Sequence, residues 1–459
     1  MNQKNDLTKG RIFTSILLLA LPIMGTSFVQ MAYNLTDVIW IGKIGSDATA
    51  AVGTAGFYMW FAMGLIYLCR IGAEVLVAQS VGRKDLKATK EIVQNVLQLI
   101  LVFAIVAMAV VLLFRHQLIA FFDIKEIQVV EMAVLYLSIV CLGFVFTFLN
   151  PIFTAIFNGY GKSSVPFGIN TIGLVFNIVF DPLLIFGVGP FPKLGVAGAA
   201  IATVMAQAVV TIVFIIYIRA NKDIHMFEDL HILNKPDFTR IKNIVKIGLP
   251  AGLQSILFTF MAMLIARIIA DWGAVAIAVQ KVGSQIESVS WMTASGFSTA
   301  TSTFVGQNYG AGKYDRIKYG YRISFIIMFI IGLITTFGLI FFAEPLFKIF
   351  INEPKALKEG IIYLRILGVS QLFMCIEIVT NGAFNGLGKT LHPAVNSVAF
   401  NALRVPLALI LSSTALSLSG VWWSISISSI LKGTVIVTLF VYVLSKVKKE
   451  LENPMQEAI

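Results

Sequence analysis

Residues 157–187 read FNGYGKSSVPFGINTIGLVFNIVFDPLLIFG. A hairpin signal, NGYGK at residues 158–162, comes first, and a long apolar run containing Asp181 follows it. The same signal returns as FNGLGK at residues 384–389, and a proline follows within a few residues in both copies. In the second copy Val405 stands where Asp181 stands in the first. The chain is therefore predicted to be duplicated, with the acid kept only in the first copy.

The composition places the chain in a membrane. It has 459 residues, of which 58% are hydrophobic and only 13% charged, and its mean hydropathy is +0.86. Soluble domains are typically about 45–50% apolar and about 25% charged. Apolar runs of about 20 residues, the length that crosses a bilayer, recur about twelve times. We predict an all-α integral membrane protein of twelve transmembrane helices.

The longest polar segment divides these spans into two sets of six. We predict a first lobe over residues 1–219, an inter-lobe linker over 220–246, a second lobe over 247–445 and a polar tail over 446–459. Apart from the repeated hairpin, the pair Leu21-Pro22 recurs as Leu249-Pro250. An even number of spans in each copy gives the two lobes the same orientation, as in parallel repeats.

Loop charges predict how the chain is oriented. If the N-terminus is cytoplasmic, most of the lysines and arginines fall in the cytoplasmic segments, as the positive-inside rule requires. Both termini are then cytoplasmic, in a multi-pass protein of the cell membrane. The formal net charge of +11 is explained by these loops, so nucleic-acid binding is not expected.

Several function classes have no sequence signature here. The three cysteines lie in apolar runs, and the four histidines show no metal-ligand spacing. There is no P-loop to bind ATP and no nucleophile elbow. An enzyme, a cofactor and a structural metal are therefore not expected, and transport is driven by an ion gradient or is passive.

Two acids in the first lobe are the candidate coupling residues. Asp37 lies well along the first span and Asp181 well along the fifth, so both fall at a similar depth. Charges inside a bilayer usually face a cavity or a partner and mark functional sites. Asn177, one helical turn before Asp181, and a hydroxyl such as Thr203 could add oxygens for Na⁺. The alternative is that both acids are hydrogen-bonded structural groups.

The second lobe also carries acids within its spans. Glu287 and Glu377 could line a cavity. Structural pairing with Arg404, Lys432 or Arg365 is an equally good interpretation, and the sequence does not separate the two.

The combination of these features resembles the MATE family, the multidrug and toxic compound extrusion antiporters. The resemblance covers nearly the whole chain, and within the family it is greatest to the DinF-like branch, because the membrane acids concentrate in the first lobe. The matching features are Leu21-Pro22, Asp37, VAQSVG at residues 77–82, FNG at residues 157–159, and Asn177 with Asp181-Pro182.

The resemblance implies two pseudo-symmetric six-helix lobes around a central cavity, which opens alternately to the two sides. It implies export of cationic or amphipathic drug-like molecules in exchange for H⁺ or Na⁺, by a protein that acts as a monomer. Asp37 would be the main protonation site. Asp181, Asn177, Tyr33, Tyr136 and Thr203 would surround it, and Asn158, Glu287 and Glu377 would line the cavity.

Two departures from the family pattern favour the proton. NorM-type relatives carry an acid in the seventh span, and residues 254–259 contain none. They carry another just after the tenth-span hairpin, where this chain has Lys389 and Thr390. A Na⁺ site of that kind in the second lobe is not expected, whereas Na⁺ at Asp37, Asn177 and Asp181 stays open.

The alternative function is a flippase for a lipid or a lipid-linked oligosaccharide. Such a protein would bind a large anionic headgroup, and Arg70, Arg365, Arg404 and Lys432 could form a basic cavity for it. Flippases of that kind often carry further spans, which this chain lacks. A channel would need a continuous pore, and a membrane enzyme would need a reactive cluster; the sequence indicates neither.

Overall fold

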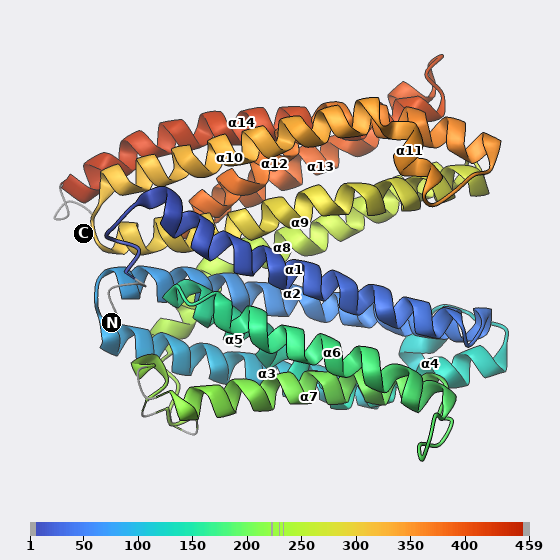
Figure 1. Ribbon diagram of the computed structural model, residues 1–459, viewed down its shortest axis with the longest axis horizontal. Helices are drawn as coiled ribbons and strands as arrows, with labels where there is room; N and C mark the ends of the chain where they lie inside the picture. The colour runs from blue at the N-terminus through green and yellow to red at the C-terminus, as the bar shows by residue number, and fades with distance from the viewer. Residues whose placement is uncertain (1–5, 222–223, 229, 233, 453–459) are drawn as a thin grey trace. The chain divides into compact units, whose positions relative to one another are not determined.

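The computed structural model describes residues 6–221, 224–228, 230–232 and 234–452, and within these ranges the chain forms helices and no strands. Figure 1 shows the helices in chain order. They are α1 (Ile12–Gly42), α2 (Ser46–Gly82), α3 (Leu86–Ala120), α4 (Ile127–Leu142), α5 (Phe144–Tyr160), α6 (Ser164–Phe186), α7 (Val196–Ala220), the short 3₁₀ turn η2 (His225–Phe227), α8 (Phe238–Ala270), α9 (Ala274–Gly310), α10 (Tyr314–Phe341), α11 (Ala343–Lys348), α12 (Pro354–Gly386), α13 (Leu391–Ser412) and α14 (Leu418–Glu452).

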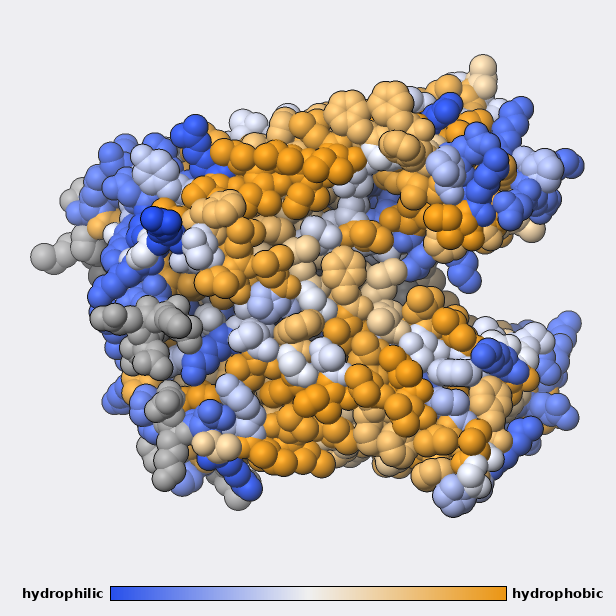
Figure 2. All heavy atoms as spheres, viewed as in Figure 1, coloured by the Kyte–Doolittle hydropathy of each residue, from blue (hydrophilic) through white to orange (hydrophobic). Residues whose placement is uncertain are grey.

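The helices have the length and surface of membrane spans. Among the described residues ten helices are long and apolar enough to cross a bilayer, or eleven when α4 and α5 are taken as one bent span. Large apolar side chains on their sides are exposed, as with Leu113 on α3 and Ile334 on α10. In each part of the molecule apolar residues cover the helix sides and hydrophilic residues gather at the helix ends (Figure 2). Such surfaces suit lipid and not water.

The remaining predicted span forms a helix that is only weakly apolar. We expected a span at residues 275–305, and α9 (Ala274–Gly310) occupies it, yet α9 is less apolar than the ten helices above. Much of α9 is buried, and Gly382 of α12 brings the two helices close: a Cβ built there would lie 2.1 Å from the Ser298 carbonyl oxygen. Because α9 packs against protein, its small and polar residues meet other helices and not lipid.

The fourth predicted span is bent. We expected one helix over residues 129–157, but the structure has α4 and α5, which meet at Gly143 at an angle of 51°. A Cβ built on Gly143 would lie 2.7 Å from the Cγ2 atom of Val204 on α7. Only a glycine allows α7 to approach the bend so closely.

The repeated hairpin signal forms the same helix-ending turn twice. Gly161 follows α5 with φ +89°, and the Lys162 amide donates to the Phe157 carbonyl oxygen at 2.9 Å. Gly388 follows α12 with φ +75°, and the Lys389 amide donates to the carbonyl oxygen of the equivalent phenylalanine at 3.0 Å. A left-handed glycine at this position ends a helix in a Schellman motif. The motif thus makes each copy turn from one span into the next.

The chain divides into two compact units, but not at the predicted boundary. The first unit contains residues 25–252, and the second contains residues 6–24 and 253–459. Helices α1 and α8 therefore each contribute residues to both units. In the second unit the Arg316 guanidinium donates to the Leu7 and Lys9 carbonyl oxygens at 2.9 and 3.0 Å, which attaches the segment before α1. The prediction of a first lobe over residues 1–219 missed this exchange of helix halves.

Two further boundaries differ from the prediction. Residues 238–246, which we assigned to the linker, form the first turns of α8, because the Asp237 carboxylate caps that helix by accepting from the Thr239 amide at 2.8 Å. Residues 446–452, which we assigned to the tail, continue α14. Residues 453–459 of the predicted tail lie outside the described residues.

Candidate functional site

Asp181 and Asn177 lie on one face of α6, inside the first unit. Their spacing of four residues places them one above the other on a helix. The Asn177 Nδ2 atom donates to the Asp181 Oδ1 atom at 3.1 Å. The exposed fractions of Asn177 and Asp181 are 0% and 1%, although both side chains are polar. Burying such groups is costly unless they are hydrogen-bonded or paired.

Asp37 reaches the same place from α1. Its carboxylate lies close enough to Asp181 and Asn177 to interact with both. Ionised carboxylates only accept hydrogen bonds, so two of them in contact need a proton or a cation between them. Asp37 Oδ1, Asn177 Oδ1 and Asp181 Oδ2 are buried, and no donor among the described residues reaches them. Three buried oxygens are thus left for a species that the chain itself does not supply.

Two tyrosines and a backbone carbonyl complete the surroundings. The Tyr33 hydroxyl on α1 donates to the Thr203 carbonyl oxygen on α7 at 3.3 Å. Tyr136 on α4 is buried, and both tyrosines lie close enough to interact electrostatically with the two acids. The structure therefore brings together side chains from α1, α4 and α6 and a carbonyl group from α7. Thr203 takes part through its backbone, whereas the sequence pointed to its hydroxyl.

Pro182 adds a local irregularity beside Asp181. A proline inside a helix has no N–H for the carbonyl group one turn earlier. In α6 that carbonyl group belongs to Ile178, whose side chain is exposed. The backbone next to the acid pair is therefore less firmly bonded than the rest of the helix.

The other predicted cavity residues lie elsewhere. Asn158 is buried in α5, its Oδ1 atom has no hydrogen-bond donor among the described residues, and no described contact joins it to Asp37 or Asp181. Glu287 and Glu377 lie in α9 and α12 of the second unit, and both are buried. They belong to a separate set of polar groups.

The structure separates the pairings that the sequence left open for these two glutamates. Glu377 pairs with Lys432, whose Nζ atom lies 3.1 Å from its Oε2 atom. Glu287 Oε2 accepts from the Gln371 amide at 3.0 Å. Arg365 is exposed, so it is not part of this buried set. Gln371 was not among the predicted site residues, because a glutamine in an amphipathic helix gives no distinguishing signal.

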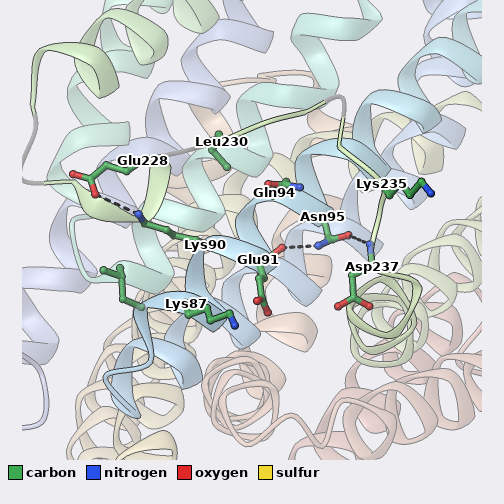
Figure 3. Close-up of a pocket in the computed structure, with 10 residues that line it drawn as sticks. Lys87, Lys90, Glu91, Gln94, Asn95, Glu228, Leu230, Lys235 and Asp237 are labelled. Carbon is green, nitrogen blue, oxygen red and sulfur yellow. Dashed lines mark hydrogen bonds and ion pairs between the residues drawn. The ribbon is translucent and has the colours of Figure 1, made fainter.

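A cavity of about 520 Å³ lies outside the spans, where the linker lies along the start of α3 (Figure 3). Several contacts hold the linker there. Lys90 Nζ lies 3.3 Å from Glu228 Oε2, and the Asp237 amide donates to Asn95 Oδ1 at 2.7 Å. His225 Nδ1 lies 2.7 Å from Glu228 Oε1. The hydrogen bond with His225, together with Lys90, lowers the pKa of the exposed Glu228 carboxyl group. These contacts fix the linker on the first unit.

No metal centre is present in the described part of the chain, where no group of three or more His, Cys, Asp or Glu side chains could hold a metal ion. The acid pair supplies only two carboxylates. A cation bound there would have to share the amide oxygen of Asn177 or water. A single proton needs no further ligands.

A bundle of membrane helices with a buried acid pair in its first unit is the architecture of a membrane transporter. The family model described as MatE matches residues 22–183 and again residues 250–410, so each copy matches by itself. The chain belongs to this family, the multidrug and toxic compound extrusion proteins, and is not an enzyme.

Relatives match over nearly their full length. The chain is 27% identical to the probable multidrug resistance protein NorM of Thermotoga maritima, covering 95% of this chain and 94% of that protein. It is also 27% identical to the probable multidrug resistance protein YoeA of Bacillus subtilis, covering 90% of each. A solved outward-facing multidrug resistance MATE family transporter of the MOP superfamily has a TM-score of 0.91 at 24% identity, covering 98% of this chain and 99% of that one. The last comparison confirms the predicted fold.

Proposed function

We propose that this protein exports cationic or amphipathic small molecules in exchange for a cation that binds at Asp37 and Asp181. The observation that carries the proposal is the set of three buried oxygens, on Asp37, Asn177 and Asp181, that have no donor among the described residues. The names of the relatives NorM and YoeA, both described as probable multidrug resistance proteins, support the choice of substrate. We place the chain in the DinF-like branch, because its unpaired acids are in the first lobe.

The exchange follows from competition for one charge. When a proton or Na⁺ occupies the acid pair, the carboxylates are neutralised and no longer attract a cationic substrate. When the cation leaves, the negative charge returns. Two ligands that weaken each other's binding in this way are negatively coupled, as an antiporter requires. Each is therefore released when the other binds.

We favour H⁺ over Na⁺ as the coupling ion. Na⁺ prefers several oxygen ligands, whereas the pair offers two carboxylates and one amide. A proton satisfies two facing carboxylates by itself, as in the carboxylate pairs of aspartic proteases. Cytoplasmic termini and a monomeric state complete the proposal.

The test is uptake of ethidium into proteoliposomes under one imposed gradient at a time. A pH gradient should drive uptake and a Na⁺ gradient should not. Asp37→Asn should abolish the driven uptake, because an amide does not take up and release a proton as a carboxylate does. The variant should still insert and elute from a size-exclusion column like the native protein. Normal driven uptake by Asp37→Asn would refute the role of the acid pair.

The flippase alternative has less support. A basic cavity for an anionic headgroup needs cations that are free to bind it. Lys432 pairs with Glu377, and the Arg404 guanidinium donates to Ser428 at 2.9 Å and to Ser429 at 3.3 Å. Both cations are engaged inside the second unit. A vesicle assay in which a fluorescent anionic lipid is moved across the bilayer, with no ethidium-dependent proton flux, would favour the flippase.

A further inference from the structure

The second unit buries both signs of charge. Glu287 on α9, Glu377 on α12 and Lys432 on α14 have exposed fractions of 9%, 3% and 8%. Arg404 on α13 is half-buried. Four helices thus bring two acids and two bases into one region. Charges are rarely found in such surroundings unless each has a partner.

Glu377 is fully satisfied by groups of the chain itself. Its Oε2 atom lies 3.1 Å from Lys432 Nζ. Its Oε1 atom accepts from the Asn381 amide at 3.0 Å and from the Ser397 hydroxyl at 3.3 Å. A carboxylate with a fixed ammonium partner and two neutral donors has no need of a further cation.

Glu287 is also held within the set, by a chain of polar groups. Gln371 donates to its Oε2 atom at 3.0 Å, and Gln371 in turn accepts from Ser290 at 2.8 Å. Tyr363 and Arg404 lie close enough to act on Glu287 electrostatically, whereas its buried Oε1 atom has no hydrogen-bond donor among the described residues. The guanidinium thus supplies the positive charge that this carboxylate would otherwise lack.

The neighbouring helix adds no further charge to this set. On α10, which packs against α12, the buried titratable group is Tyr321, and its hydroxyl is hydrogen-bonded to Thr380 at 3.0 Å. The charges that face one another are therefore Glu287 and Glu377 against Arg404 and Lys432, and their sum is zero.

The first unit is different, because no base in the described part of the chain acts on its acid pair, Asp37 and Asp181. Among the described residues, the groups that act on Asp37 and Asp181 are each other and Asn177, with Tyr33 close by, and none of them is a lysine or arginine. Buried like charges do not persist without compensation. The two copies therefore balance their buried acids differently. The first needs a mobile cation, whereas the second uses the side chains of Lys432 and Arg404.

We propose that Lys432 and Arg404 are permanent internal counter-ions, which close the second unit to transported cations and leave one cation-binding unit per carrier. The inference rests on the proposed function, since it assigns the exchanged cation to the first unit alone. Lys432 and Arg404 thereby set how many cations move with each substrate.

The experiment measures how the melting temperature of the purified protein in detergent depends on pH and on Na⁺. A ligand that binds only the native state raises stability with its concentration. Asp37→Asn combined with Asp181→Asn should remove most of the cation dependence of the native chain. Adding Lys432→Met to that double variant should restore a dependence, because Glu377 then lacks its partner and takes up a cation. The matched control, Lys432→Met together with Glu377→Gln in the same background, should show none.

Two results would overturn the inference. In the first, the melting temperature of the Asp37→Asn, Asp181→Asn double variant still depends on pH and Na⁺ as in the native chain, and adding Glu377→Gln removes that dependence. In the second, adding Lys432→Met to the double variant gives a folded protein whose melting temperature gains no dependence on pH or Na⁺.

A transport measurement covers the case in which Lys432→Met fails to fold. The charge-neutral pair Lys432→Met and Glu377→Gln, in the otherwise native chain, should move the native number of protons per ethidium in proteoliposomes. A changed ratio contradicts the inference. If instead Asp37→Asn alone exports normally, the proposed function fails, whereas the ratio for the neutral pair tests only the second unit.

Discussion

Replacing Asp181 by asparagine removes one charge of the acid pair with almost no change in shape. The Asn177 amide, which now donates to Asp181 Oδ1 at 3.1 Å, would still find an acceptor oxygen at that position. Two unit charges about 4 Å apart, in surroundings with an effective dielectric constant of about 20, repel by about 4 kcal/mol. The folded protein carries this repulsion whenever both acids are ionised and no cation is bound, and the unfolded chain does not. Asp181→Asn should therefore be more stable than the native protein by up to about 4 kcal/mol in Na⁺-free buffer at high pH.

The sign of the pH dependence follows from the same reasoning. When the folded pair shares a proton that the separated acids of the unfolded chain have lost, the native state binds more protons, and its stability falls as the pH rises. The advantage of the variant should thus be greatest near pH 9 and shrink towards pH 5. With an unfolding entropy of about 2.1 cal/mol/K per residue, a chain of this length gains about 1 °C per kcal/mol, so the largest difference is about 4 °C.

The assay is thermal unfolding of both proteins in one detergent, from pH 5 to pH 9, with and without Na⁺. Asp47→Asn is the matched control, because Asp47 is exposed at the start of α2 and lies outside the acid pair. Its effect should not change with Na⁺. A stability difference for Asp181→Asn that is the same at every pH would show that the two acids do not repel in the folded protein, and the coupling scheme would then be wrong.

Two other changes test how the elements are held. A Cβ at Gly248 of α8 would lie 1.9 Å from the Leu68 carbonyl oxygen of α2, so Gly248→Ala should lower the free energy of unfolding by about 1–3 kcal/mol or more. The control Gly168→Ala, where a Cβ meets nothing within 4 Å, should leave it unchanged. Equal melting temperatures for the two variants would contradict this packing. Glu228→Gln should speed hydrogen exchange of residues 224–228 at pH 7, because the interactions with His225 that lower the pKa of Glu228 are present above its ordinary pKa of about 4 and are lost as the pH falls through the lowered value. Native and variant proteins should therefore exchange alike once the pH is low enough to protonate Glu228, and a difference that persists there would rule out the charge as the cause.

Much of the acid pair could be predicted because helical periodicity is a local property. Asn177 and Asp181 are four residues apart in an apolar run, so any helix places them on one face. An acid in such a run is rare enough that a second one at similar depth, Asp37, is its natural partner. In the structure Asp37 of α1 lies close enough to Asp181 of α6 to interact with it.

The partners in the second unit could not be predicted in the same way. Arg404, Lys432 and Arg365 are all basic residues in apolar segments, and periodicity does not say which of them meets Glu377. The choice depends on how α12, α13 and α14 rotate against one another, since Lys432 turns inward to Glu377 and Arg365 turns outward. Helix rotation is set by the packing of many side chains at once.

By itself the sequence determined the duplication, the membrane location, the turn that ends α5 and α12, and the acids that occupy the first copy. These depend on composition, on periods of a few residues and on a glycine at a fixed place in a motif. Only the tertiary structure decided that α1 and α8 divide between the two units, that α4 bends into α5 at Gly143, and that the second copy carries its own counter-ions. Each of these depends on contacts between segments far apart in the chain, which no local pattern encodes.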